Sequence, residues 1–266
     1  MPISRFERAT RLGLEQAGRV AVAATDLRTR ARTGTGSRSG DRSAPTAAPG
    51  PVVLVGGFAA TGPVLDPMAA RLRARGHDVL PVTTGAGLGC AGRAAEALAD
   101  RVIETAERTG APVQVVGHSR GGQFARVAAA RADVRAGAHV AGLVTLGAPF
   151  DLYGLRWPTL AQAAAVSAAG SLGVPGLATL ACLRGGCCAA FRAGLRAPWP
   201  RDVPFTSIYS RSDRAVPWRS SHDPHARNVE VAGGHLALLT APPAFREVCA
   251  ALTRSAVEPR RPAFAV

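Results

Sequence analysis

From Pro51 onward, short and mostly apolar runs alternate with longer stretches of helical pattern. The runs expected to form strands are Val52–Val55, Val79–Val82, Val113–Val116, Ala141–Leu146, Phe205–Tyr209 and Val229–Val231. The stretches expected to form helices are Val64–Arg75, Gly92–Arg108, Gly121–Arg131 and Pro243–Leu252. Strands without polar alternation are buried on both faces, and strands that alternate with helices form parallel sheets. The sequence therefore predicts an α/β fold, with a mostly parallel sheet of about six strands covered by helices on both faces.

The composition divides the chain near residue 50. Residues 1–28 have the pattern of one helix, whereas residues 29–50 are dominated by Gly, Ser, Thr, Pro, Ala and Arg and are expected to be a flexible linker. Residues 51–266 hold enough apolar side chains for one domain. Within it, residues 151–200 separate two strands by far more chain than a crossover needs, which predicts a helical cap over the C-terminal edge of the sheet.

The chain carries a net charge of +14, and all 32 of its basic residues are arginines. The arginines are scattered, and a nucleic-acid-binding protein would be expected to gather them into a stripe or a known motif. We therefore expect no nucleic-acid partner. The combined excess of Arg and Ala is typical of a GC-rich genome.

The apolar segments are short or interrupted. The run Val20–Ala24 is too short for the core of a signal peptide, and glycines and prolines interrupt the uncharged stretch from Trp157 to Leu183. These features predict a cytoplasmic protein. Peripheral membrane contact, through residues 1–28 and the uncharged insertion, is a further hypothesis.

The five cysteines are Cys90, Cys182, Cys187, Cys188 and Cys249. An odd number does not make a complete disulfide framework. The cysteines at 182, 187 and 188 lack a second pair of ligands at the spacing of a zinc site. The sequence therefore predicts free thiols or one local bridge, and no metal.

The segment Gly117-His-Ser119-Arg-Gly121 matches the pattern G-x-S-x-G, between an expected strand and an expected helix. Small flanking residues allow the sharp, strained turn that lifts a serine hydroxyl above the end of a sheet and beside a helix N-terminus. In this context the pattern predicts that Ser119 is a nucleophile.

With this motif, residues 51–254 resemble the α/β-hydrolases, and within them the bacterial lipases and esterases. The segments 182–188 and 203–213 are similar to a group of actinobacterial lipase-like hydrolases. The resemblance implies that the backbone amides of Phe58, in the turn after the first strand, and of Arg120 form the oxyanion hole. The family commonly has His-Gly where this chain has Gly56-Gly57. Because the oxyanion hole uses backbone N–H groups, either residue type is compatible with that role.

The resemblance also implies the two partners of the nucleophile. Asp213 follows the next-to-last strand and precedes Val216-Pro217, and His235 follows the last strand, so that Ser, Asp and His occur in the order of the fold. The alternatives for the acid are Asp202 and Asp223, and those for the base are His222 and His225.

The predicted function is hydrolysis of a carboxylic ester through an acyl-enzyme, without a cofactor or metal. The expected partner is a small acyl ester or lipid, and the oligomeric state is left open. An amidase, a thioesterase or an acyltransferase could use the same triad, and a non-catalytic binding protein could share the fold. We expect the insertion to line an apolar pocket for the acyl chain with Trp157, Leu160, Leu177 and Phe191.

Overall fold

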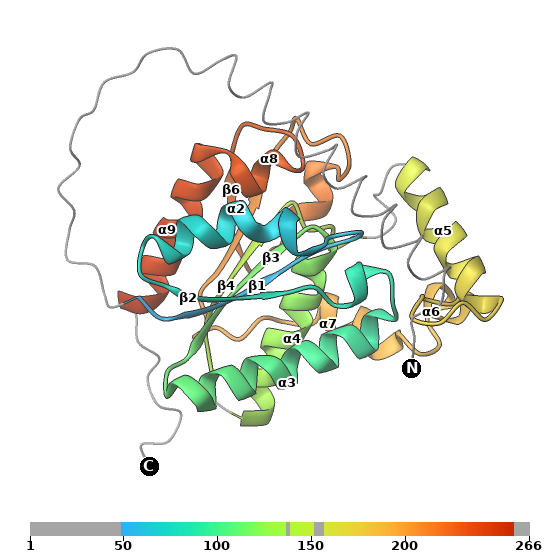
Figure 1. The fold of residues 1–266 in the computed structure, drawn as a ribbon, viewed down its shortest axis with the longest axis horizontal. Helices are drawn as coiled ribbons and strands as arrows, with labels where there is room; N and C mark the ends of the chain where they lie inside the picture. The colour runs from blue at the N-terminus through green and yellow to red at the C-terminus, as the bar shows by residue number, and fades with distance from the viewer. Residues whose placement is uncertain (1–48, 137–138, 152–156, 258–266) are drawn as a thin grey trace.

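The computed structural model describes residues 49–136, 139–151 and 157–257. They form a six-stranded sheet with helices on both sides (Figure 1). The strands are β1 (Pro51–Val55), β2 (Asp78–Val82), β3 (Val113–His118), β4 (Val140–Leu146), β5 (Phe205–Tyr209) and β6 (Arg227–Glu230). They lie in the order β2-β1-β3-β4-β5-β6, and every neighbouring pair is parallel. The predicted α/β sheet is confirmed.

Helices cover the two faces of this sheet and continue beyond its edge. They are α2 (Gly62–Arg73), α3 (Ala91–Thr109), α4 (Arg120–Ala136), α5 (Trp157–Ser171), α6 (Leu180–Arg184), α7 (Ala189–Arg196), α8 (Ala237–Thr240) and α9 (Pro242–Val257), with the 3₁₀ turns η1 (Gly85–Gly87) and η3 (Trp218–Ser221). The predicted boundaries of the strands and of the four predicted helices differ from these by a few residues. The largest shifts in the strands are of two residues: β3 ends at His118 instead of Val116, and β6, at the sheet edge, begins at Arg227 instead of Val229.

Two hydrophobic cores lie on opposite faces of the sheet. On β1, Val53 and Val55 belong to the core under α3 and α4, whereas Val52 and Leu54 belong to the core under α2 and α9. Figure 1 shows these helix pairs on opposite sides of the strands. Successive side chains of a strand point to opposite faces, so an uninterrupted apolar strand is what a sheet buried on both faces requires.

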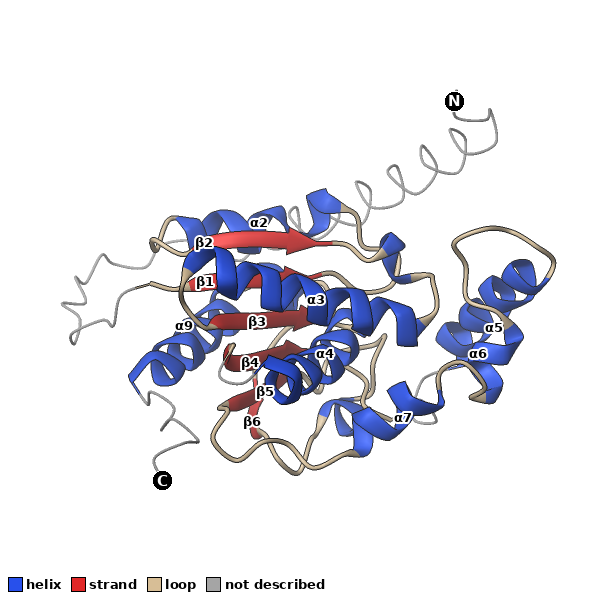
Figure 2. Ribbon diagram, turned by 90° about the horizontal axis from the view of Figure 1, so that it is seen from below, coloured by secondary structure: helices blue, strands red, loops and turns tan. Residues whose placement is uncertain are grey.

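The insertion between β4 and β5 is helical and contains α5, α6 and α7. In Figure 2 the strands point toward the side of the molecule where these helices lie. We call α5 and α6, with the chain that joins them to α7, the cap. The helix and linker expected over residues 1–50 fall almost entirely on residues 1–48, which lie outside the described part of the chain. Among the described helices, none has the length and apolar character needed to span a bilayer.

Candidate active site

Ser119 occupies a strained turn between β3 and α4. Its φ of +55° lies in the left-handed region, which residues with a side chain rarely adopt. The turn is so tight that a Cβ on Gly117 would lie 2.6 Å from the Cα of Gly122, and one on Gly121 would lie 2.5 Å from the carbonyl oxygen of Val55. The two glycines of the motif are therefore required by close backbone contacts on both sides of the serine.

Asp213 and His235 are joined by a hydrogen bond. The Nδ1 atom of His235 lies 2.6 Å from Oδ2 of Asp213, which is buried in the loop after β5. The other carboxylate oxygen accepts hydrogen bonds from the backbone N–H groups of Ala215 (2.8 Å) and Val216 (2.9 Å). Burial alone would raise the pKa of Asp213, but the bond with His235 and the two amide donors outweigh it and hold the pKa below its ordinary value.

This geometry fixes the tautomer of His235. A carboxylate held in its ionised form can only accept hydrogen bonds, so Nδ1 of His235 carries the proton. The Nε2 atom then keeps its lone pair and can accept a proton from another group.

His118, inside the G-x-S-x-G segment, is a residue that the sequence left without a role. Its buried ring lies 4.7 Å from the ring of His235, centroid to centroid, and its Nε2 lies 3.0 Å from the carbonyl oxygen of His235. The carbonyl can only accept, so Nε2 of His118 carries a proton and donates it to this bond. Burial and the nearby His235 lower the pKa of His118 to about 3, so the ring is neutral near pH 7. His118 thus anchors the backbone of His235 directly beside Ser119.

The end of β4 connects the serine to the Asp–His pair. The backbone N–H of Ser119 donates to the carbonyl oxygen of Leu146 at 2.8 Å. At the next residue, Gly147, a Cβ would lie 3.2 Å from Oδ2 of Asp213 and 3.3 Å from Nδ1 of His235. The three predicted catalytic residues therefore gather around one strand end at the C-terminal edge of the sheet.

The two expected oxyanion donors also lie at this edge. A Cβ on Gly57 would lie 2.8 Å from Cβ of Ser119 and 3.0 Å from the backbone nitrogen of Arg120. The turn that carries Phe58 after β1 is therefore pressed against the first residues of α4. Strands β1 and β3 are neighbours, and their connections leave toward opposite sides of the sheet. Such a switch point is where open α/β sheets bind ligands.

The alternative acid and base residues are engaged elsewhere or exposed. Asp223 forms a buried ion pair with Arg126, with 2.6 Å between Oδ2 and Nε. Asp202, His222 and His225 are exposed. Asp223 also accepts from the backbone N–H of His225, but among these described candidates Asp213 and His235 are the pair whose side chains are hydrogen-bonded to each other.

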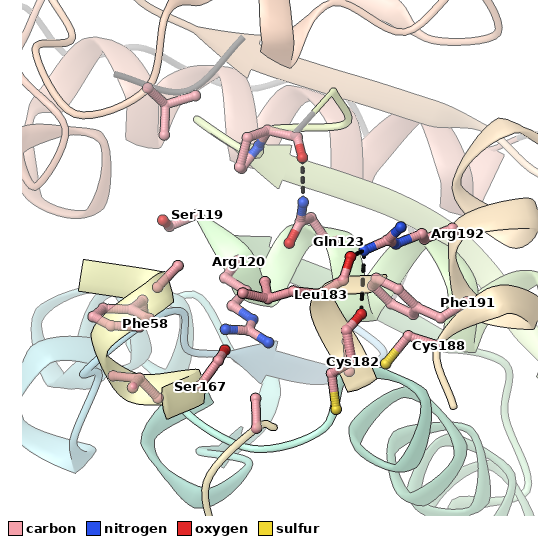
Figure 3. A pocket seen from close by; sticks show the side chains of 16 residues that line it. Phe58, Ser119, Arg120, Gln123, Ser167, Cys182, Leu183, Cys188, Phe191 and Arg192 are labelled. Atoms are coloured by element: carbon pink, nitrogen blue, oxygen red, sulfur yellow. Dashed lines mark hydrogen bonds between the residues drawn. The ribbon is translucent and has the colours of Figure 1, made fainter. Parts of the chain in front are cut away.

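A cavity of about 130 Å³ opens beside Ser119 (Figure 3). Its wall is mostly apolar and is formed by residues of both the sheet edge and the cap. The lining residues are Phe58, Ala91, Ser119, Arg120, Gln123, Pro149, Ala163, Val166, Ser167, Ala178, Cys182, Leu183, Cys188, Phe191, Arg192 and Val216.

The structure places the four expected pocket residues differently. Phe191 lines the cavity, but Trp157, Leu160 and Leu177 do not. The Trp157 side chain is 78% exposed and that of Leu160 is 38% exposed, at the start of α5. The face of α5 that reaches the cavity carries Val166 and Ser167 instead.

The structure also changes the view of the cysteines. The sulfur atoms of Cys182, Cys187 and Cys188 meet that of Cys90, from the start of α3, and all four lie within 4.8 Å of one another. The fourth ligand that the sequence spacing lacked is thus supplied by a distant part of the chain, and these four thiols could hold a metal ion.

The parallel sheet, the strained serine turn at its switch point and the acid–histidine pair after its last strands define the α/β-hydrolase fold. The chain is similar to the mature form of a lipase from Bacillus licheniformis, with 18% sequence identity and a TM-score of 0.53 over 81% of this chain and 96% of the lipase. It is also similar to an α/β-hydrolase enzyme from the metagenome of sediments of the Mar Chica lagoon in Morocco, with 19% identity and a TM-score of 0.51 over 77% of this chain and 90% of that enzyme. No protein-family model and no curated protein matches the chain. At these identities the likeness is one of fold.

Proposed function

We propose that the protein is a serine hydrolase that cleaves carboxylic esters, with Ser119 as nucleophile, His235 as general base and Asp213 as the residue that orients His235. The observation that carries the proposal is the 2.6 Å hydrogen bond between His235 and Asp213 at the strand end that also binds the backbone of Ser119. A nucleophile, a base and a buried acid in this arrangement are the parts that acyl transfer requires.

The reaction follows from the protonation states. The free lone pair on Nε2 of His235 takes the proton from Ser119 as Oγ attacks the ester carbonyl. Ionised Asp213 stabilises the imidazolium that forms. The amides of Phe58 and Arg120 stabilise the oxyanion, and His235 then returns the proton to the leaving alcohol. Water, activated by the same histidine, hydrolyses the acyl-enzyme.

The cavity supports an uncharged acyl group as the substrate. Among the described residues that line it there is no carboxylate, the two arginines, Arg120 and Arg192, donate to backbone carbonyl oxygens, and most of the wall is apolar. An apolar cavity of about 150 Å³ holds one benzene molecule, so the cavity of about 130 Å³ is suited to a chain of similar bulk. We therefore propose short to medium acyl esters as substrates, each buried methylene contributing about 0.8 kcal/mol.

The test combines active-site labelling with kinetics. A fluorophosphonate should label Ser119, as mapped by mass spectrometry, and Ser119→Ala and His235→Ala should each lower kcat by about three orders of magnitude or more. Asp213→Asn should also lower kcat severely, because it disturbs the tautomer of His235. Thioester and amide analogues of the best ester establish the reaction class.

Ser167→Ala provides the matched control, because Ser167 is a second serine in the wall of the same cavity. This variant should keep both labelling and turnover. Labelling that survives in Ser119→Ala, or that is lost in Ser167→Ala alone, would contradict the assignment of the nucleophile.

A further inference from the structure

Four cysteines from separate parts of the chain meet at one point beside the cavity. Cys90 precedes α3, Cys182 lies in α6, and Cys187 and Cys188 directly precede α7. The Sγ–Sγ distances are 3.1 Å for Cys182–Cys187, 3.6 Å for Cys90–Cys188, and 3.8 Å for both Cys90–Cys187 and Cys187–Cys188. The cluster joins the cap to a helix that packs on the sheet.

These distances match the ligand shell of a tetrahedral ion. Thiolates bind Zn²⁺ at about 2.3 Å, and a regular tetrahedron of that size places its sulfur atoms about 3.8 Å apart. Three of the four contacts lie within 0.2 Å of that spacing, and no pair in the cluster exceeds 4.8 Å. Four sulfur ligands in this geometry are typical of zinc.

A helix end and a backbone donor lie beside two of the four sulfur atoms. Cys90 is the N-cap residue of α3, a helix of 19 residues, whose positive end stabilises a negative sulfur. The backbone N–H of Thr179 lies 3.5 Å from the sulfur of Cys182. Such outer hydrogen bonds orient and stabilise metal-bound sulfur.

A partly buried cation lies near the cluster. The guanidinium of Arg120 donates to the carbonyl oxygen of Gly89, the residue before Cys90, at 3.1 Å, and Arg120 lines the same cavity as Cys182 and Cys188. Four thiolates around a divalent ion leave a net charge of −2. Arg120 offsets part of that charge, so the site is electrostatically prepared for the loaded state.

We propose that Cys90, Cys182, Cys187 and Cys188 bind one Zn²⁺ ion that fastens the cap to the body of the protein. Binding releases four protons, one from each thiol, and involves no redox step. All four positions of the ion are taken by protein ligands, so the site is structural and has no open position for catalysis. Because Cys182 and Cys188 also line the cavity, the ion fixes one wall of the substrate pocket.

The experiment measures metal directly and needs no ester, so its outcome is independent of the proposed hydrolase activity. The full chain is purified without a metal-affinity step, in the presence of a phosphine reductant, and analysed by plasma mass spectrometry. We expect about one zinc per chain. Replacement of the zinc by Co²⁺ should give the visible d–d bands of a tetrahedral thiolate site. A chelator should lower the melting temperature, whereas the reductant alone should not.

Cys182→Ser and Cys90→Ser should each lose the zinc and the cobalt spectrum. Cys249→Ser is the matched control, since Cys249 lies outside the cluster, and it should retain both. Should a cluster variant fail to fold, thiol titration of the wild-type chain still decides. In this titration the chain is unfolded by denaturant, the chelator removes any metal and no reductant is present. All five thiols should then react with the thiol reagent. A single reactive thiol would indicate two disulfides and overturn the proposal. Five free thiols with no bound zinc, even after incubation with Zn²⁺, would also overturn it.

Discussion

The neutral His118 should make the folded protein sensitive to acid. Its pKa is lowered to about 3 by burial and by His235, whereas an imidazole in the unfolded chain titrates near 6.5. Between these two values the unfolded state binds a proton that the folded state does not. Lowering the pH through this window therefore favours unfolding, and the stability that depends on a neutral His118 is fully present only above pH 6.5.

The expected size follows from the two pKa values. Each pH unit inside the window costs about 1.4 kcal/mol, so lowering the pH from 7 to 5 should remove about 2 kcal/mol of unfolding free energy through His118 alone. In His118→Gln, an amide that does not titrate can still donate to the carbonyl oxygen of His235. This variant should lose about 2 kcal/mol less than the wild type over the same range.

Urea unfolding at pH values from 7 to 5, followed by tryptophan fluorescence, measures the two slopes. Carboxylates also titrate in this range, but they do so in both proteins, and the difference between the proteins isolates His118. The exposed His222 provides the control, and His222→Gln should follow the wild type. Parallel pH profiles for the wild type and His118→Gln would refute the assignment of a neutral, donating His118 in the folded protein.

Three further predictions test the turn, the core and the cavity. Gly121→Ala should destabilise the protein by about 1–3 kcal/mol and abolish labelling of the serine, because its Cβ would lie 2.5 Å from a backbone oxygen of β1; thermal unfolding and labelling measure this. Asp223→Asn should cost about 3–5 kcal/mol in urea unfolding, because it leaves a buried guanidinium without its counter-charge. Val166→Phe should fill the cavity and shift the best p-nitrophenyl ester to a shorter acyl chain, whereas Val174→Phe, outside the cavity wall, should leave the kcat/KM profile unchanged. An unchanged optimum in Val166→Phe, or the same shift in both variants, would remove the cavity from the account of chain-length preference.

The sheet and its turn could be predicted because their determinants are local. The run Val113–Val116 is apolar except at Gln114, and the structure buries it on both faces as part of β3. The G-x-S-x-G pattern could be placed on a strand–turn–helix unit because its glycines are required there. A Cβ at either position would clash with backbone atoms of that unit or of β1. Asp213 and His235 could be proposed as partners because the resemblance to the α/β-hydrolases implies these roles for residues that follow the last two strands, and parallel strands end at the same edge of a sheet.

The environment of these residues could not be predicted from the sequence. The contact between Cys90 and Cys187 joins positions 97 residues apart, and no spacing rule for zinc ligands covers such a distance. The anchoring role of His118 depends on a backbone oxygen, which any residue type at position 235 would present. Both features arise from tertiary packing and have no sequence pattern of their own.

The cap shows why apolar side chains alone did not identify the pocket wall. Helix α5 is rich in alanine, so it has no distinct apolar stripe that would indicate which face turns inward. Trp157 was predicted to line the pocket because it is large and apolar. It is the first residue of α5 and is exposed, whereas the smaller Val166 and Ser167 reach the cavity. Where hydrophobicity is spread evenly around a helix, contacts with the rest of the protein decide which face of the helix points inward.

The site therefore has two parts with different physical origins. The proposed chemistry rests on the sheet edge, where Ser119, His118 and His235 are held by backbone contacts to β4 and to one another. The proposed selection of the acyl chain depends on the cap. The cap contacts the rest of the protein at the cysteine cluster and at α7, whose Phe191 packs against α4. None of the four clustered cysteines takes part in the hydrogen bond between Asp213 and His235, so in the proposed hydrolase a change in the cap can alter substrate selection while this pair stays in place. Arg120 belongs to both parts: its backbone nitrogen lies in the tight turn that holds Ser119, and its side chain lines the cavity that also reaches Cys182 and Cys188.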